Sequence, residues 1–213
     1  MAGKAGKSIS LTDRLLDEAN EKRMNKVVSS LEKKDTFPKL LLHRAKASGN
    51  APAYRQKNLG IWQTLTWAKA EETTELIALG LQSIGLKRDD KVAIIGQNTS
   101  SLYLCFVAVQ ALGAVPVPLY PDSNAEELSE ILKHSEVKGA ICQDQEQVDK
   151  IEQLKNEISS IEFVAYEELR GMRNYNSTYL YSLETLKGVG RDQKNKNPVS
   201  FNSSISGGKG SDL

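Results

Sequence analysis

The stretch KVAIIGQNTSSLYLCFVAVQALGAVPVPLYPD, residues 91–122, decides the fold. It opens with a short β-branched run over 91–95 and continues into an almost wholly apolar segment over 102–112. Gly113 then stops the predicted helix, because glycine tolerates the conformation that ends one. The run over 114–119 predicts a second strand. A strand, a helix and a strand in this order indicate a parallel βαβ unit with a buried helix.

Two prolines qualify the second strand of this unit. Pro116 and Pro118 cannot donate to a ladder, so they predict an edge strand or an irregular one. The apolar run over 102–120 is long enough to suggest a membrane span, but Gly113 and both prolines interrupt it. We interpret it as a buried helix followed by a short buried strand.

The same pattern continues downstream of residue 122. Asn124 predicts the cap of a helix in which Leu128, Ile131 and Leu132 face inward. Further strands are predicted over 138–142 and 161–166, with a helix between them that begins after Asp144. The sequence therefore predicts an α/β fold. Its core is a partial doubly wound, mostly parallel sheet over about residues 90–166, with helices on both faces.

Upstream, the pattern changes to a hairpin and helices. Short strands are predicted at 53–57 and 60–65, between a helix that begins at Thr36 and one that begins near Thr66. Four segments follow from this organisation, and they are listed by residue number: a disordered lead (1–10), an amphipathic helical arm (11–33), an N-terminal subdomain (35–190) and a disordered tail (191–213). The tail is rich in Asn, Lys, Ser and Gly, a composition that rarely folds alone.

Composition excludes several function classes. The chain has 213 residues, with 28 basic and 27 acidic side chains, and a formal net charge of +1. Such a balance does not favour nucleic-acid binding. Cys105 and Cys142 are too few for a disulfide framework or a zinc cluster, so we expect two buried, reduced thiols. We also expect no transmembrane segment and a cytoplasmic location, while peripheral membrane contact and a homo-oligomer stay open.

No catalytic, cofactor-binding or metal-binding residue is predicted from the motifs. The segment from Ser206 to Gly210 is rich in glycine and carries a lysine, but it lacks the spacing of a phosphate loop, and a flexible terminus explains it better. His43 and His134 have no evident nucleophile partner. Tyr120, Pro121 and Asp122 follow the carboxyl end of a predicted strand, where open parallel sheets bind ligands. These three are the substrate-binding candidates.

Several segments together resemble the adenylate-forming (AMP-dependent synthetase) superfamily, closest to bacterial long-chain fatty acyl-CoA synthetases. The segments that carry the resemblance are DTFPKLLLHRAKASGNAPAYRQKNLGIWQTLTWAKAEE (35–72), GLKRDDKVAIIGQN (85–98), VQALGAVPVPLYPDS (109–123), DQEQVDKI (144–151) and RGMRNY (170–175). Asp89 stands where the family usually has glycine. The resemblance implies the N-terminal subdomain of such an enzyme.

The resemblance also implies a reaction and its substrates. Fatty acid, ATP and CoA give acyl-CoA, AMP and diphosphate, with magnesium and a loop of the type YTSGTTGxPK holding the phosphates. That loop does not occur in these 213 residues. We therefore expect a fragment, truncated before the ATP loop, that is inactive alone and needs no cofactor of its own.

Two alternatives remain open at this level. One is a non-enzymatic interaction module that kept the sheet and lost the chemistry. The other is an unrelated flavodoxin-like domain that binds a nucleotide or a flavin. The missing phosphate fingerprint speaks against the second alternative.

Overall fold

The computed structural model describes residues 18–24 and 34–212. Residues 18–24 are helical, and they belong to a different unit from Thr36–Leu213, so each unit is described by itself. The predicted lead over residues 1–10 lies outside the described residues. The same holds for the predicted arm over 11–33 apart from its helical part at 18–24.

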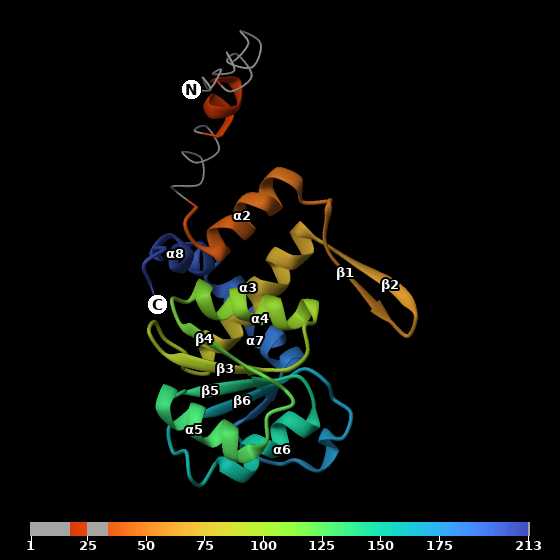
Figure 1. Cartoon of the computed structure of the whole chain (residues 1–213), viewed down its shortest axis with the longest axis vertical. Coiled ribbons are helices and arrows are strands. Elements are labelled where there is room, and N and C mark those ends of the chain that lie inside the picture. The colour runs from red at the N-terminus through yellow and green to blue at the C-terminus, as the bar shows by residue number, and fades with distance from the viewer. Residues whose placement is uncertain (1–17, 25–33, 213) are drawn as a thin grey trace, which may run out of the picture. The chain divides into compact units, whose positions relative to one another are not determined.

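The larger unit combines a small hairpin with an α/β sheet (Figure 1). Its helices are α2 (Phe37–Ser48), α3 (Trp67–Ser83), α4 (Ser100–Ala111), α5 (Ala125–Ser135), α6 (Gln145–Leu154), the 3-10 turn η1 (Met172–Asn174), α7 (Leu183–Lys196) and α8 (Ser200–Ser206). Its strands are β1 (Pro52–Asn58), β2 (Ile61–Thr66), β3 (Lys91–Ile95), β4 (Val115–Leu119), β5 (Gly139–Cys142), β6 (Phe163–Tyr166) and β7 (Leu180–Ser182).

Side-chain caps fix where the predicted helices begin. The Thr36 hydroxyl accepts the backbone N–H of Lys39 at the start of α2, and Thr66 does the same for Lys69 at the start of α3. Asn124 and Glu127 form a reciprocal capping box at α5. Each cap satisfies a backbone donor that has no partner within its helix. The predicted helix starts are therefore confirmed at these positions.

The main sheet has five strands in the order β4-β3-β5-β6-β7, and every neighbouring pair is parallel. β4 lies at the edge, as Pro116 and Pro118 predict. Along the chain, β3 is followed by β4, which lies on one side of it in the sheet. The next strand, β5, lies on the other side of β3. The winding therefore reverses between β3 and β5. The predicted doubly wound parallel sheet is confirmed, with β7 as a further strand at the far edge.

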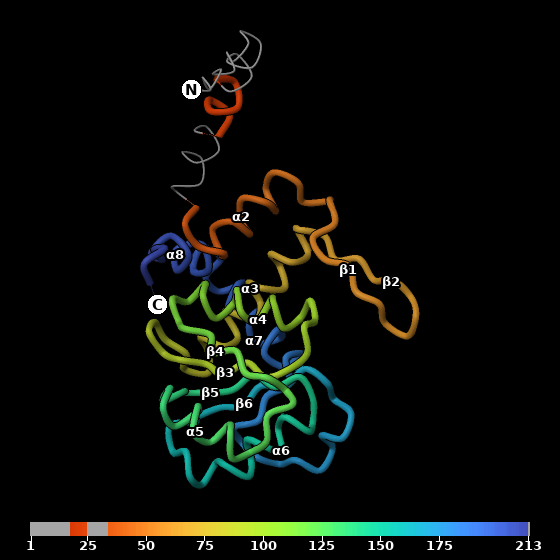
Figure 2. Tube along the Cα trace, in the orientation of Figure 1, coloured from red at the N-terminus to blue at the C-terminus, as the bar shows by residue number. Residues whose placement is uncertain are grey.

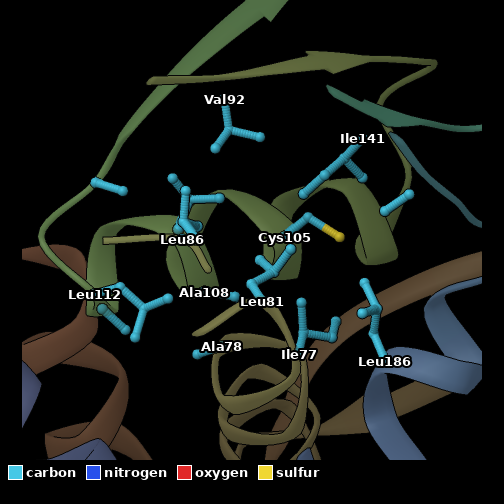
Figure 3. Close-up of a cluster of buried hydrophobic side chains, with 14 of the residues drawn as sticks. Ile77, Ala78, Leu81, Leu86, Val92, Cys105, Ala108, Leu112, Ile141 and Leu186 are labelled. Carbon is cyan, nitrogen blue, oxygen red and sulfur yellow. The ribbon is translucent and has the colours of Figure 1, made fainter. Parts of the chain in front are cut away.

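Alternating side chains of the strands supply two separate cores. Val92 and Ile94 of β3 pack in one core with side chains of α3, α4, α7 and α8, whereas Ala93 and Ile95 pack in the other with side chains of α5 and α6. Figure 3 shows part of the first core, where Ile77 of α3 lies near Cys105 of α4 and other apolar side chains. Burial on both faces explains why the strands are continuously apolar instead of alternating.

The predicted inward face of α5 is correct at two positions and wrong at one. Leu128 and Leu132 are fully buried, but Ile131 is 42% exposed. A position three residues from Leu128 and one from Leu132 lies at the margin of the buried stripe, so periodicity alone assigned it to the wrong side.

The prediction of a disordered tail over 191–213 is wrong for its first part. α7 continues to Lys196, and α8 follows over Ser200–Ser206. Phe201 and Ile205 of α8 are buried in the same core as α3 and α4. Two apolar side chains, spaced four apart, thus anchor a segment whose average composition is polar.

The hairpin of β1 and β2 is antiparallel, as predicted, and extends away from the main sheet (Figure 2). At its base, Tyr54 and Leu65 pack against a small cluster formed by α2, α3 and α4. The apolar run over 102–120 forms most of α4 and then β4, in agreement with its interpretation as a helix followed by a strand. Within residues 18–24 and 34–212, no helix combines the length and the hydropathy needed to cross a bilayer.

Candidate functional site

The carboxyl edge of the main sheet is the candidate site. In an open parallel sheet, ligands bind where the winding reverses, outside the carboxyl ends of the two strands concerned. In this chain those strands are β3, which ends at Ile95, and β5, which ends at Cys142. The geometry therefore directs attention to Gly96 and Gln97 on one side and to Gln143 on the other.

A side-chain bridge spans this point of reversal. The backbone N–H of Gln97 donates a hydrogen bond of 2.5 Å to Oε1 of Gln143. Gly96 makes the close approach feasible, because a Cβ on Gly96 would lie only 2.7 Å from the Cβ of Gln143. The side chain of Gln143 thus joins the two loops at the point where the winding reverses. The sequence analysis did not identify Gln143. Gly96, directly after a buried strand, could have indicated that another segment approaches the backbone closely there.

Glu167 lies at the same edge, directly after β6. Its backbone N–H donates to the carbonyl of Cys142 at 3.0 Å, which ties the residue after β6 to the end of β5. Burial raises the pKa of the Glu167 carboxyl, while Ser101 and the more distant Lys187 act in the opposite direction. A carboxyl group with a raised pKa at a strand end is a polar feature that the sequence did not reveal.

The predicted substrate-binding residues follow β4, one strand away from the point of reversal. Tyr120 is 82% exposed, and Asp122 is also exposed. The carbonyl of Pro121 accepts a hydrogen bond from Nζ of Lys150, which also forms an ion pair of 3.1 Å with Glu146. The turn is thus tied to α6. A binding role for Tyr120, Pro121 and Asp122 stays a prediction.

The hairpin reaches this edge at the first turn of α4. Oε1 of Gln56 on β1 accepts from the backbone N–H of Ser100 at 2.9 Å and from its hydroxyl at 3.1 Å. The ring of Tyr54 stacks on Tyr103 of α4, with centroids 6.4 Å apart. These contacts fix the base of the hairpin beside the carboxyl edge of the sheet.

An open pocket of about 530 Å³ lies at the opposite, amino-terminal edge of the sheet. Residues from the loop before β3, the ends of α3 and α4, and α8 line it; they are Gln82, Gly85, Leu86, Lys87, Arg88, Leu112, Ser203, Ser204 and Gly207. Arg88 forms an ion pair of 2.9 Å with Asp212. The pocket therefore exists because the tail folds back onto this edge. The segment from Ser206 to Gly210 follows a helix here, and no strand leads into it.

The remaining reactive side chains are unsuited to catalysis as they stand. Cys105 and Cys142 are free and buried, as predicted. Burial raises the pKa of Cys105 to about 12 and also raises that of Cys142, so both are neutral thiols. His43 and His134 are exposed on α2 and α5. Within the described ranges, no three His, Cys, Asp or Glu side chains are grouped to hold a metal ion.

Comparison with known proteins decides the family. The profile of the family described as "AMP-binding enzyme" matches residues 41–196, which is most of the chain. The chain belongs to this family. The predicted resemblance to AMP-dependent synthetases is therefore confirmed.

Individual relatives agree with the family assignment. The long-chain-fatty-acid--CoA ligase ACSBG2 of Rattus norvegicus is 26% identical over 156 residues, which cover 73% of this chain and 23% of the relative. The long-chain-fatty-acid--CoA ligase FadD15 of Mycobacterium bovis is 36% identical over 77 residues, or 36% of this chain and 13% of the relative. The chain thus spans less than a quarter of either relative.

Solved structures match the fold in the same way, over most of this chain and a minor part of the other protein. The acetoacetyl-CoA synthetase from Streptomyces lividans superposes with a TM-score of 0.63 at 19% identity, covering 70% of this chain and 24% of that one. The described sheet and helices therefore have the architecture found within an adenylate-forming enzyme.

One residue outside the candidate site has an unusual backbone conformation. Asp89 has a φ of 66°. Glycine adopts this left-handed region without cost, whereas the Cβ of other residues comes close to their own backbone. Asp89 is thus a point of local backbone strain in the loop before β3.

Proposed function

We propose that this chain supplies the N-terminal portion of an AMP-forming long-chain fatty acid–CoA ligase. The reaction converts fatty acid, ATP and CoA into acyl-CoA, AMP and diphosphate. The observation that carries the proposal is the family match over residues 41–196, together with relatives that are named long-chain-fatty-acid--CoA ligases. The buried, neutral thiols fit a reducing compartment, and we place the protein in the cytoplasm.

The role of the described residues in this proposal is to build and hold one wall of the site. The bridge between Gln97 and Gln143 and the bond from the Glu167 N–H to the Cys142 carbonyl fix the loops at the carboxyl edge. Fixed loops reduce the entropy that substrate binding would otherwise lose. We assign no proton transfer and no nucleophile to these residues.

The chain alone is expected to be inactive. The resemblance implies that a YTSGTTGxPK-type loop holds the ATP phosphates, and no such loop occurs among the 213 residues. Backbone N–H groups and a lysine that neutralise phosphate charge are a large part of such catalysis. Purified chain incubated with palmitate, ATP, magnesium and CoA should therefore release no diphosphate and form no acyl-CoA. Clear turnover would contradict this part of the proposal.

A chimera tests the positive part. This chain would replace the corresponding N-terminal segment of FadD15 from Mycobacterium bovis, so that FadD15 supplies everything that follows. We expect the chimera to form palmitoyl-CoA, with intact FadD15 and FadD15 lacking its N-terminal segment as controls. A folded chimera that forms no acyl-CoA would contradict the proposal and favour the non-enzymatic interaction module. Circular dichroism and a cooperative thermal transition establish that the chimera is folded.

A further inference from the structure

The tip of the β1–β2 hairpin carries apolar side chains that nothing in the larger unit covers. Leu59 is 97% exposed, Ile61 66% and Trp62 63%. Figure 2 shows the tip extending beyond the helices at its base. Isolated exposed apolar residues are ordinary, but three within four positions on a projecting turn form a local apolar surface.

The conformation of Leu59 makes this surface more unusual. Leu59 and Gly60 form the turn, with φ values of 48° and 81°. Two-residue turns of this kind favour Asn, Asp or Gly at the first central position, because side chains without a local hydrogen bond strain the left-handed backbone. A leucine therefore brings strain and exposed apolar surface to a position where asparagine would bring neither. The packing of the described residues therefore does not explain why leucine occupies position 59.

The charge of the hairpin indicates which kind of partner would bind it. Residues 52–66 contain Arg55 and Lys57 and no acidic residue. In the ladder Lys57 pairs with Trp62, and the Lys57 ammonium lies 5.5 Å from the centroid of the Trp62 ring. Arg55 lies two residues before Lys57, so both cations are on the same face as Trp62. The opposite face carries Ile61 at the tip and Gln56, which holds the hairpin to α4, so apolar side chains lie on both faces of the tip.

We propose that this hairpin tip, with Leu59, Ile61 and Trp62 inserted and Arg55 and Lys57 above them, docks on the surface of an anionic lipid membrane. Tryptophan is enriched at the membrane–water interface because its ring is amphipathic. Basic side chains beside it gain from the negative surface potential of anionic lipids. A second copy of the chain is a poorer occupant, since pairing two hairpins would place like charges together. The inference does not depend on the proposed ligase function.

Flotation of the 213-residue chain with lipid vesicles tests the proposal. Vesicles containing phosphatidylglycerol in phosphatidylcholine should carry the chain, and in a Trp67→Phe variant, whose remaining tryptophan is Trp62, the emission should shift to shorter wavelength. Vesicles of phosphatidylcholine alone should bind at least tenfold less chain, and raised salt should weaken binding to the anionic vesicles. Absence of binding to both compositions would overturn the proposal.

Variants separate the tip from the rest of the surface. Leu59→Asn and Trp62→Thr should each weaken vesicle binding about tenfold, while Arg55→Gln and Lys57→Gln should each weaken it about fivefold, as expected for one basic residue at an anionic surface. Leu169→Asn, which removes an exposed leucine from another loop, should leave binding unchanged. Equal binding by all variants would contradict the proposal. A dimer in ultracentrifugation that Leu59→Asn abolishes would show that a second copy is the occupant instead.

Discussion

Gly190 of α7 and Gly80 of α3 meet at the point where these two helices cross. A Cβ built on Gly190 would lie 3.1 Å from the backbone nitrogen of Gly80 and 2.0 Å from the carbonyl oxygen of Leu76. A Cβ on Gly80 would in turn lie 2.3 Å from the carbonyl oxygen of Leu186. The absence of side chains at both positions therefore lets the two backbones approach within contact distance.

Gly190→Ala should destabilise the fold through this contact. The clash is with backbone atoms, which cannot move aside as a flexible side chain would, so the helices must separate. We expect the free energy of unfolding, measured by urea denaturation, to fall by about 2 to 3 kcal/mol. Gly188→Ala is the matched control on the same helix, because a Cβ there meets nothing within 4 Å. It should raise the free energy of unfolding by about 0.5 to 1 kcal/mol through helix propensity. Equal effects of the two substitutions would contradict the close crossing.

Asp89→Gly should stabilise the chain by relieving backbone strain. Asp89 has a φ of 66°, which glycine adopts without cost. Aspartate tolerates this region better than most residues, and glycine adds entropy to the unfolded state, so we expect a net gain of about 0.5 to 1 kcal/mol. Chemical denaturation measures it. Asp89→Ala removes the same carboxylate but keeps the strain, so it should give no gain. A gain of similar size for Asp89→Ala would show that loss of the carboxylate charge, and not relief of backbone strain, stabilises the chain.

The two cysteines should react only when the chain unfolds. Both are buried, and burial raises the pKa of Cys105 to about 12, so neither thiol supplies a thiolate near neutral pH. Titration with a disulfide reagent should label neither thiol in the folded chain and both in guanidinium. Ser159→Cys, which places a thiol at an exposed position, should add one fast-reacting group. Fast reaction of the unmodified folded chain would show that the core opens readily.

Glu167→Gln should stabilise the chain near neutral pH. Burial raises the pKa of Glu167 above its ordinary value of 4.5, so the charged form is less favourable in the folded chain than in the unfolded one. This penalty is complete above the folded pKa and disappears as pH falls below 4.5, where the carboxyl is protonated in both states. The gain from the substitution should shrink over the same range. Glu130→Gln, at an exposed position of α5, is the matched control for removing a carboxylate. A gain at Glu167 that persists in acid would contradict the assignment.

The sequence predicts the sheet well because each strand from β3 to β6 is a short apolar run bounded by turn residues. It fails at β7, whose three residues, Leu180–Ser182, are too few for a periodic pattern. It also fails at the end of α7, where Gly188 and Gly190 lower helix propensity. Gly190 is explained by its contact with Gly80, and such contacts between distant segments leave no local pattern in the chain.

Only the edge of the sheet that carries the candidate site could be predicted. The rule that ligands bind at the carboxyl ends of parallel strands applies to any strand, and it pointed to Tyr120 at the end of β4. The winding reverses between β3 and β5 instead, which depends on strand order and so on the fold. Gln143 and Glu167 became visible only when Gln97 and Ser101 were placed beside them.

Formation of palmitoyl-CoA by the chimera with FadD15 is the most direct test of the proposed ligase role. With palmitate, ATP, magnesium and CoA, the account predicts product from the chimera and none from the 213-residue chain assayed alone. Product from the isolated chain, or a folded chimera that forms none while intact FadD15 does, would contradict it.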